Sequence, residues 1–341
     1  MRKSLNFKNS KSNEMHGARV FSTSLIRLLH DALRVSLDLF RIMVPVLVVI
    51  KILQELQLIR YLAMPLAPMM KLVGLPAEMG LVWATAILSS IYSAVIVFLS
   101  LVKETPITTA QATVLGTMIL LAHCLPIELR IAQKSGPHLM FQAISRLGSA
   151  LLLGWLLNTF YSCFNLLQQP VNILFKPDAE STAYDGTLVC WAASQVRDLI
   201  SIFVIIIGLL ALMRILENLG IIDVMNRVLR PILKHMGIGA KASGIAIIGL
   251  TLGIAYGGGL IIHEARSGNI DKRDVFYSLT LMGLSHGLFE DTLLMVLMGG
   301  HLSGVLWARV AFSLLVVAFL VKVSSRLPEA FCDRILWGVA K

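Results

Sequence analysis

The stretch GLVWATAILSSIYSAVIVFLSLV, residues 80–102, decides the fold, because it is long and apolar yet carries serines at its centre. A helix that crosses the hydrocarbon core of a bilayer needs about 20 residues. A second stretch, SGIAIIGLTLGIAYGGGLII at residues 243–262, is similarly long and has a glycine-rich centre. Each stretch is therefore either one transmembrane helix or a re-entrant hairpin of two short helices that meet at the soft centre.

Composition places both stretches in a membrane protein. Of the 341 residues 56% are hydrophobic and only 15% are charged, which is too little polar surface for a soluble domain. The net charge of +10 comes without an RNA-binding motif or a basic helix, so we expect no nucleic-acid partner. The interpretation is an all-α polytopic protein of the bacterial cytoplasmic (inner) membrane, where excess Lys and Arg mark cytoplasmic loops.

The chain repeats itself at an offset of 163 residues. IKILQELQLI (50–59) aligns with MRILENLGII (213–222), and APMMKLVG (67–74) aligns with RPILKHMG (230–237). LLAHCLPIEL (120–129) aligns with GLSHGLFEDT (283–292). In this alignment three polar residues have counterparts, which are His123 with His286, Glu128 with Asp291, and Arg146 with Arg309.

Each half is predicted to hold the same series of apolar elements: an amphipathic lead with a span, a short amphipathic segment, the interrupted stretch, and two further spans. The ranges are 20–58, 60–73, 79–102, 107–128 and 139–162, then 183–220, 223–236, 243–263, 270–291 and 302–324. The predicted organisation is a basic cytoplasmic tail (1–19), a first repeat (20–165), an extracytoplasmic connection (166–182), a second repeat (183–325) and a cytoplasmic tail (326–341).

Charge bias favours hairpins over crossings. If the interrupted stretches are hairpins, each half crosses the membrane three times, the halves are inverted, and both termini are cytoplasmic. Most Lys and Arg residues then lie inside, as the positive-inside rule requires. If the stretches cross, each half has four spans, and the strongly basic segment 223–236 lies outside. We therefore predict two inverted repeats, each with about three transmembrane helices, an amphipathic helix and a re-entrant hairpin.

The two hairpin tips are the predicted binding region for a small polar solute or ion. Irregular backbone at membrane depth is tolerated where it lines a cavity, and helix ends there offer free polar groups. The candidate residues are Ser89, Ser90, Tyr92 and Ser93, with Gly253, Tyr256, Gly257, Gly258 and Gly259. The alternative is that these small residues only allow close helix packing.

The arrangement resembles the Gate (nucleoside-recognition) family, which includes spore maturation proteins A and B and the membrane half of ferrous-iron transporter B. It is also similar in plan to the hairpin-containing core of concentrative nucleoside transporters. The amphipathic leads, GLPAEMG (74–80), GIGAKASG (237–244) and the Gly/Ser-centred stretches carry the resemblance, over about residues 35–165 and 195–325. It implies a transport-like pore and gate but no substrate. The chain has neither a GxxxxGK[ST] loop nor symmetric pore cysteines, since Cys124 aligns with Gly287.

Buried carboxylate–arginine pairs are predicted in both halves. Glu128 and Arg146 lie nine positions on either side of residue 137, so they should meet in an antiparallel helix pair. Asp291 and Arg309 are placed likewise about residue 300. Pairing lowers the cost of charge in lipid, and the pairs either pin two helices or form a gate that changes with state.

The two histidines are predicted to lie apart. His123 and His286 each follow the middle of a predicted span by about five residues, or roughly 7–8 Å. In inverted halves they would be about 15 Å apart along the membrane normal. A shared metal ion needs ligands at about 2 Å, so a joint site is disfavoured, leaving two gate sites or two structural histidines.

The favoured function is a transporter or channel-like carrier of a small polar solute or ion with alternating access. One alternative is a divalent-metal transporter with His123, Cys124, Glu128, His286, Glu290 and Asp291 as ligands. A lipid-processing enzyme is disfavoured, because the chain has no HExxH or nucleophile motif, and we expect no cofactor. Another alternative is a scaffold protein that uses the amphipathic residues 22–40 to bind a partner. The sequence also allows a homo-oligomer and a Cys163–Cys190 disulfide.

Overall fold

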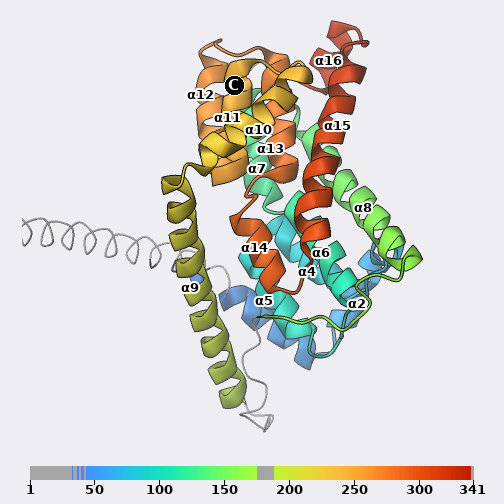
Figure 1. Cartoon of the computed structure of the whole chain (residues 1–341). Helices are drawn as coiled ribbons and strands as arrows, with labels where there is room; N and C mark the ends of the chain where they lie inside the picture. The colour runs from blue at the N-terminus through green and yellow to red at the C-terminus, as the bar shows by residue number, and fades with distance from the viewer. Residues whose placement is uncertain (1–32, 34–36, 38–39, 42–43, 175–187, 339–341) are drawn as a thin grey trace, which may run out of the picture. The chain divides into compact units, whose positions relative to one another are not determined.

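The structure is a computed structural model that describes residues 33, 37, 40–41, 44–174 and 188–338 (Figure 1). These residues are helical apart from short connections, and no strand occurs among them. They divide into two units that are taken separately. One contains α9 (Leu188–Asn218), a helix of 31 residues. The other contains residues 44–174 and 219–338 and carries all the features below.

In this second unit a helix over residues 44–55 comes first. The rest of its first half comprises α2 (Ile59–Ala63), η1 (Met64–Leu66), α3 (Ala67–Leu72), α4 (Met79–Leu88), α5 (Ile91–Leu101), α6 (Thr109–Leu121), α7 (Leu125–Ser135) and α8 (Leu139–Cys163). The second half comprises α10 (Ile221–His235), α11 (Ala240–Leu252), α12 (Ile254–Arg266), α13 (Lys272–Ser285), α14 (Glu290–Leu297), η2 (Ser303–Ala308), α15 (Arg309–Ser324) and α16 (Glu329–Ile335).

Both interrupted stretches are helical hairpins rather than single helices. α4 packs against α5, and α11 packs against α12. The first hairpin breaks at Ser90, whose extended backbone and side-chain bond to the Ser93 amide begin α5. The second breaks at Gly253, at φ +95°, a conformation that favours glycine. Helices of 10–13 residues are too short to cross a bilayer. Their re-entrant placement in the membrane stays a prediction.

The predicted spans 107–128 and 270–291 are not continuous helices, which corrects the sequence analysis. The first is interrupted between α6 and α7, where Cys124 adopts a left-handed φ of +50°. Pro126 follows, and its ring would clash with the carbonyl of residue 122 in an unbroken helix. The second is interrupted between α13 and α14, where Gly287 has φ +61°. Each half therefore contains one broken helix.

Within the unit of residues 44–174 and 219–338, the broken helices are largely buried, whereas α8 and the η2–α15 segment are largely exposed. In the described residues four segments are long and apolar enough to cross a membrane: Thr109–Ser135, Leu139–Cys163, Gln195–Asn218 and Ser303–Ser324. The first, which is α6 with α7, is 78% buried in its most apolar window. α8 and the η2–α15 segment are only 33% and 28% buried, and they expose side chains such as Trp155 and Phe319. Most of the predicted lead 20–58 lies outside the described residues.

Candidate metal centre

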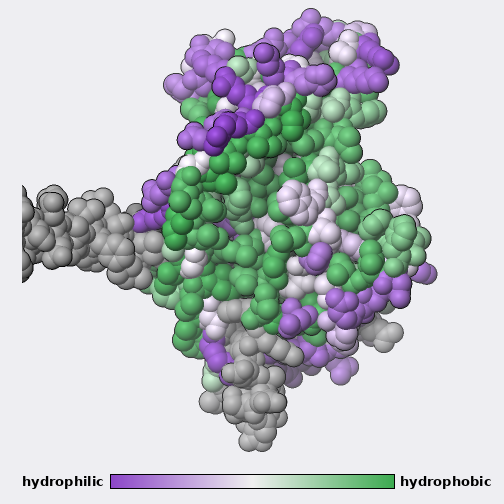
Figure 2. Space-filling model, in the orientation of Figure 1, coloured by the Kyte–Doolittle hydropathy of each residue, from purple (hydrophilic) through white to green (hydrophobic). Residues whose placement is uncertain are grey.

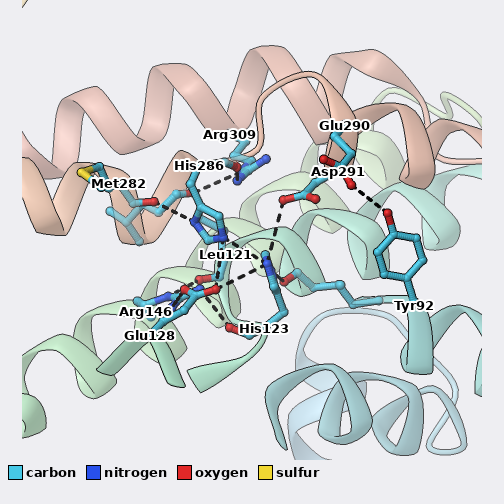
Figure 3. Close-up of polar contacts among 12 residues, drawn as sticks. Tyr92, Leu121, His123, Glu128, Arg146, Met282, His286, Glu290, Asp291 and Arg309 are labelled. Carbon is cyan, nitrogen blue, oxygen red and sulfur yellow. Dashed lines mark hydrogen bonds and ion pairs between the residues drawn. The ribbon is translucent and has the colours of Figure 1, made fainter. Parts of the chain in front are cut away.

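The breaks in the two broken helices bring His123 and His286 together (Figure 3). Their Nε2 atoms are 3.1 Å apart, their ring centroids are 4.8 Å apart, and both side chains are buried. The predicted separation of about 15 Å is wrong. That prediction placed the middle of the span near residue 118, whereas the broken helix continues to Ser135 and has His123 close to its middle.

Each imidazole is held by a backbone carbonyl of the preceding helical turn. The Nδ1 atom of His123 lies 3.0 Å from the Ile119 oxygen, and that of His286 lies 2.8 Å from the Met282 oxygen. A carbonyl oxygen only accepts hydrogen bonds, so we assign the proton of each neutral ring to Nδ1. Both Nε2 lone pairs are then directed into the space between the rings.

Two carboxylates join the histidines. Glu128, in the first turn of α7, places Oε1 3.2 Å from Nε2 of His286 and 3.7 Å from Nε2 of His123. Asp291, in the first turn of α14, places Oδ2 3.9 Å from Nε2 of His123. One donor atom each from His123, Glu128 and His286 lies within 4.8 Å of the others. We call His123, His286, Glu128 and Asp291 the His/carboxylate cluster. Both carboxylates lie in the first turn of a helix, where the positive end of the helix dipole stabilises negative charge.

Arg146 donates hydrogen bonds to the backbone at the break of the first broken helix and forms an ion pair with a carboxylate of the cluster. Its Nε donates to the Leu121 carbonyl at 2.9 Å, and Nη2 donates to the His123 carbonyl at 3.2 Å. These are carbonyls that the end of α6 leaves without helical partners. Nη1 forms a buried ion pair with Glu128. The predicted Glu128–Arg146 pair is therefore confirmed.

Arg309 repeats the backbone contacts but not the ion pair. Its Nε donates to Leu284 at 3.0 Å and Nη2 to the carbonyl of His286 at 2.6 Å. Its Nη1 is buried without a hydrogen-bond partner, and the described residues include no Asp291–Arg309 ion pair within 4.0 Å. The predicted second pair is wrong. Asp291 is the second residue of α14, whereas Glu128 is the fourth of α7, and two residues turn a side chain by about 200°.

The hydrogen bonds of the two halves follow the predicted offset. The two histidines are 163 residues apart, and so are their Nδ1 acceptors, the two arginines and the carbonyls that the arginines cap. The two breaks therefore share the same pattern of hydrogen bonds to the backbone, and they differ in the Glu128–Arg146 ion pair of the first break. The orientation of the halves in a membrane stays a prediction.

The first hairpin reaches the cluster through Tyr92. Its hydroxyl donates to Glu290 at 2.8 Å, beside Asp291. Ser89 and Ser90 lie 3.1 Å and 3.0 Å from the hydroxyl of Ser93, so these serines bond to one another around the hairpin break. Solute binding by these residues stays a prediction.

The glycines of the second hairpin allow close packing. A Cβ on Gly257 would approach the Gly249 Cα to 2.6 Å, and one on Gly258 would approach Ile131 of α7 to 2.5 Å. A Cβ on Gly259 would meet nothing within 4 Å. The Tyr256 side chain lies outside the described residues, as does that of Cys190, so the Cys163–Cys190 pairing stays a prediction.

These features define an all-α membrane protein with two hairpins and two broken helices. Residues 199–320 match the family model Gate, described as nucleoside recognition. The chain is also 25% identical over 278 residues to Uncharacterized membrane protein YvoD of Bacillus subtilis (strain 168), covering 81% of this chain and 86% of that protein. The resemblance to the Gate family is therefore confirmed. No solved structure matches.

Proposed function

We propose that this transporter-type membrane protein carries a divalent transition-metal cation through the His/carboxylate cluster. The observation that carries the proposal is the 3.1 Å approach of two imidazole nitrogens whose lone pairs face each other. Facing lone pairs repel, and a neighbouring carboxylate oxygen adds more electron density at 3.2 Å. Such an arrangement is stable when a metal ion or a proton lies between the donors.

The spacing of the donors fits a metal ion. Imidazole nitrogens bind Zn²⁺ at about 2.0–2.1 Å, so tetrahedral donors lie about 3.3 Å from one another. The observed separations of 3.1, 3.2 and 3.7 Å bracket that value. Two imidazoles with one or two carboxylates suit Zn²⁺, Fe²⁺, Co²⁺ or Mn²⁺, whereas Mg²⁺ and Ca²⁺ prefer oxygen donors alone. Cys124 and Glu290, also predicted as ligands, are not in the group of convergent donors.

The charges around the cluster favour a transient cargo over a permanent ion. The ion pair with Arg146 neutralises Glu128, and the guanidinium of Arg309 lies buried close by. A divalent ion therefore enters a site without excess negative charge and is held moderately. Conduction requires binding strong enough for entry and weak enough for release. A proton shared by the histidines in the metal-free state would leave as the metal enters, which links transport to pH.

The hairpins would act as the walls of the pathway in this proposal, with Tyr92 and Glu290 beside the cation. The charge bias of the sequence supports cytoplasmic termini in a bacterial cytoplasmic membrane. The movement between outward- and inward-open states would occur at the breaks, between α6 and α7 and between α13 and α14. Discontinuous helices around a central site are typical of transporters.

Transport in proteoliposomes tests the proposal. With a metal-sensitive dye inside the vesicles, we expect added Mn²⁺, Co²⁺, Fe²⁺ or Zn²⁺ to enter, and His286→Gln to lower the initial rate at least tenfold. His263→Gln is the matched control, because His263 is exposed and outside the cluster. Size-exclusion chromatography verifies that each variant is folded. No entry of any of the four metals, or equal rates for His286→Gln and wild type, would reject the proposal.

A further inference from the structure

A second candidate binding site lies between α10 and α11, apart from the His/carboxylate cluster. These two helices pack together and line an open pocket of about 550 Å³. Its lining residues come from both helices and include Arg227, Arg230, Lys241, Ile222, Ile245 and Ile248. The pocket therefore combines cationic and aliphatic side chains in one space.

The cationic side of the pocket has unengaged guanidinium groups. Arg227 and Arg230 are exposed, and in the described part of the chain neither has an ion pair or a side-chain hydrogen bond. Lys241 pairs with Glu264 at 2.8 Å, and Asp223 is the one acidic lining residue. Two guanidinium groups on adjacent turns of one helix can hold a phosphate with paired hydrogen bonds.

The pocket has an aliphatic side that comes from α11, and α10 carries a separate exposed apolar stripe on the face turned away from its pocket residues. Ile245 and Ile248 lie within the pocket. Val224, Val228 and Ile232 recur every four residues along α10 and are 41%, 56% and 40% exposed. Residues four apart share one face of a helix. Figure 2 shows hydrophilic and hydrophobic surface side by side where Figure 1 places α10. The stripe lies two positions from the pocket residues, about 200° around the helix, so α10 has a basic face and an opposite apolar face, which is typical of a helix in the membrane interface.

We propose that the pocket binds an anionic phospholipid. Arg227 and Arg230 bind its phosphate, and its acyl chains lie against Ile222, Ile245 and Ile248. The charge of the pocket selects an anionic headgroup, and its aliphatic lining selects a lipid, because free phosphate would leave those side chains in water. Basic pockets between membrane helices bind anionic headgroups by this chemistry.

Native mass spectrometry of the full-length protein from mixed micelles tests the lipid site. With equal phosphatidylglycerol and phosphatidylcholine, we expect retention of phosphatidylglycerol in at least fivefold excess. The double variant Arg227→Gln/Arg230→Gln should lose that preference. The control Lys322→Gln/Arg326→Gln makes the same charge change at exposed residues that do not line the pocket, and it should keep the preference.

Three results would overturn the lipid proposal. They are equal retention of the two lipids by the wild type, an equal loss of preference in the control variant, and competition by millimolar inorganic phosphate that displaces the lipid. The last result would assign the pocket to a soluble anion. If Arg227→Gln/Arg230→Gln misfolds, Arg227→Lys/Arg230→Lys replaces it and should bind phosphatidylglycerol more weakly than wild type but more strongly than phosphatidylcholine.

Discussion

His286→Gln is expected to weaken Zn²⁺ binding on the order of 100-fold or more, because it removes one of two imidazole donors. Even substitutions that only support a metal ligand typically cost 10–100-fold in affinity. Glutamine keeps much of the volume of histidine and can still donate to the carbonyl of Met282, which now accepts from Nδ1 at 2.8 Å. Isothermal titration of the purified protein in detergent measures the change.

The matched control is His263→Gln, which changes an exposed histidine in the same way and should bind Zn²⁺ like wild type. His123→Gln should resemble His286→Gln, because both rings contribute to one site. Undiminished affinity in either cluster variant, with a folded protein, would show that the histidines do not share a metal ion. A loss in only one variant would indicate a site with a single histidine.

Arg146→Met is expected to lower the free energy of unfolding by about 3–5 kcal/mol, as measured by unfolding in mixed micelles with increasing SDS. The variant leaves the Glu128 carboxylate buried without its ion-pair partner. It also removes the donors to the carbonyls of Leu121 and His123, at the end of α6. Breaking one side of a buried pair is costly because the other charge stays behind.

Arg309→Met provides the comparison, since its guanidinium caps equivalent carbonyls but has no carboxylate partner within ion-pair distance among the described residues. It should cost clearly less than Arg146→Met. The double variant Arg146→Met/Glu128→Leu should recover part of the lost stability, because no unpaired charge remains. Equal costs for the two arginines, or a double variant no more stable than Arg146→Met, would contradict the assigned role of the ion pair.

Features that depend on local sequence were predictable. The serine- and glycine-centred stretches are hairpins, because Ser90 can begin a helix and Gly253 can adopt a positive φ. The Glu128–Arg146 pair followed from equal distances to the turn between two helices. The 163-residue offset also identified the equivalent histidines and arginines. These predictions use residue types, spacings and an internal repeat that can be read in the sequence without knowing where each helix ends.

The meeting of the histidines was not predicted, because it depends on where each helix really ends. Hydropathy ended the span at Glu128, although the helix continues to Ser135 after a break. Pro126, two residues after Cys124, was the available signal for that break. Because the two halves are predicted to be inverted, the error in the middle of each span shifted the predicted depths of the two imidazoles in opposite directions, and the two errors added.

The failure of the Asp291–Arg309 pair has a different cause. Aligned residues in two repeats share a depth, but a side chain points according to its position within its own helix. α14 begins one residue before Asp291, whereas α7 begins three residues before Glu128, so the two carboxylates face different partners. Sequence alignment alone could not supply the register of either helix start.

The most direct test of the shared site is the X-ray absorption spectrum of the protein loaded with one equivalent of Zn²⁺. We predict two imidazole nitrogens at about 2.0 Å from the zinc, with carboxylate oxygen as the remaining ligand, and only one imidazole in His286→Gln. A spectrum with no imidazole scattering, or with two imidazoles that persist in both His123→Gln and His286→Gln, would contradict a metal centre between the broken helices.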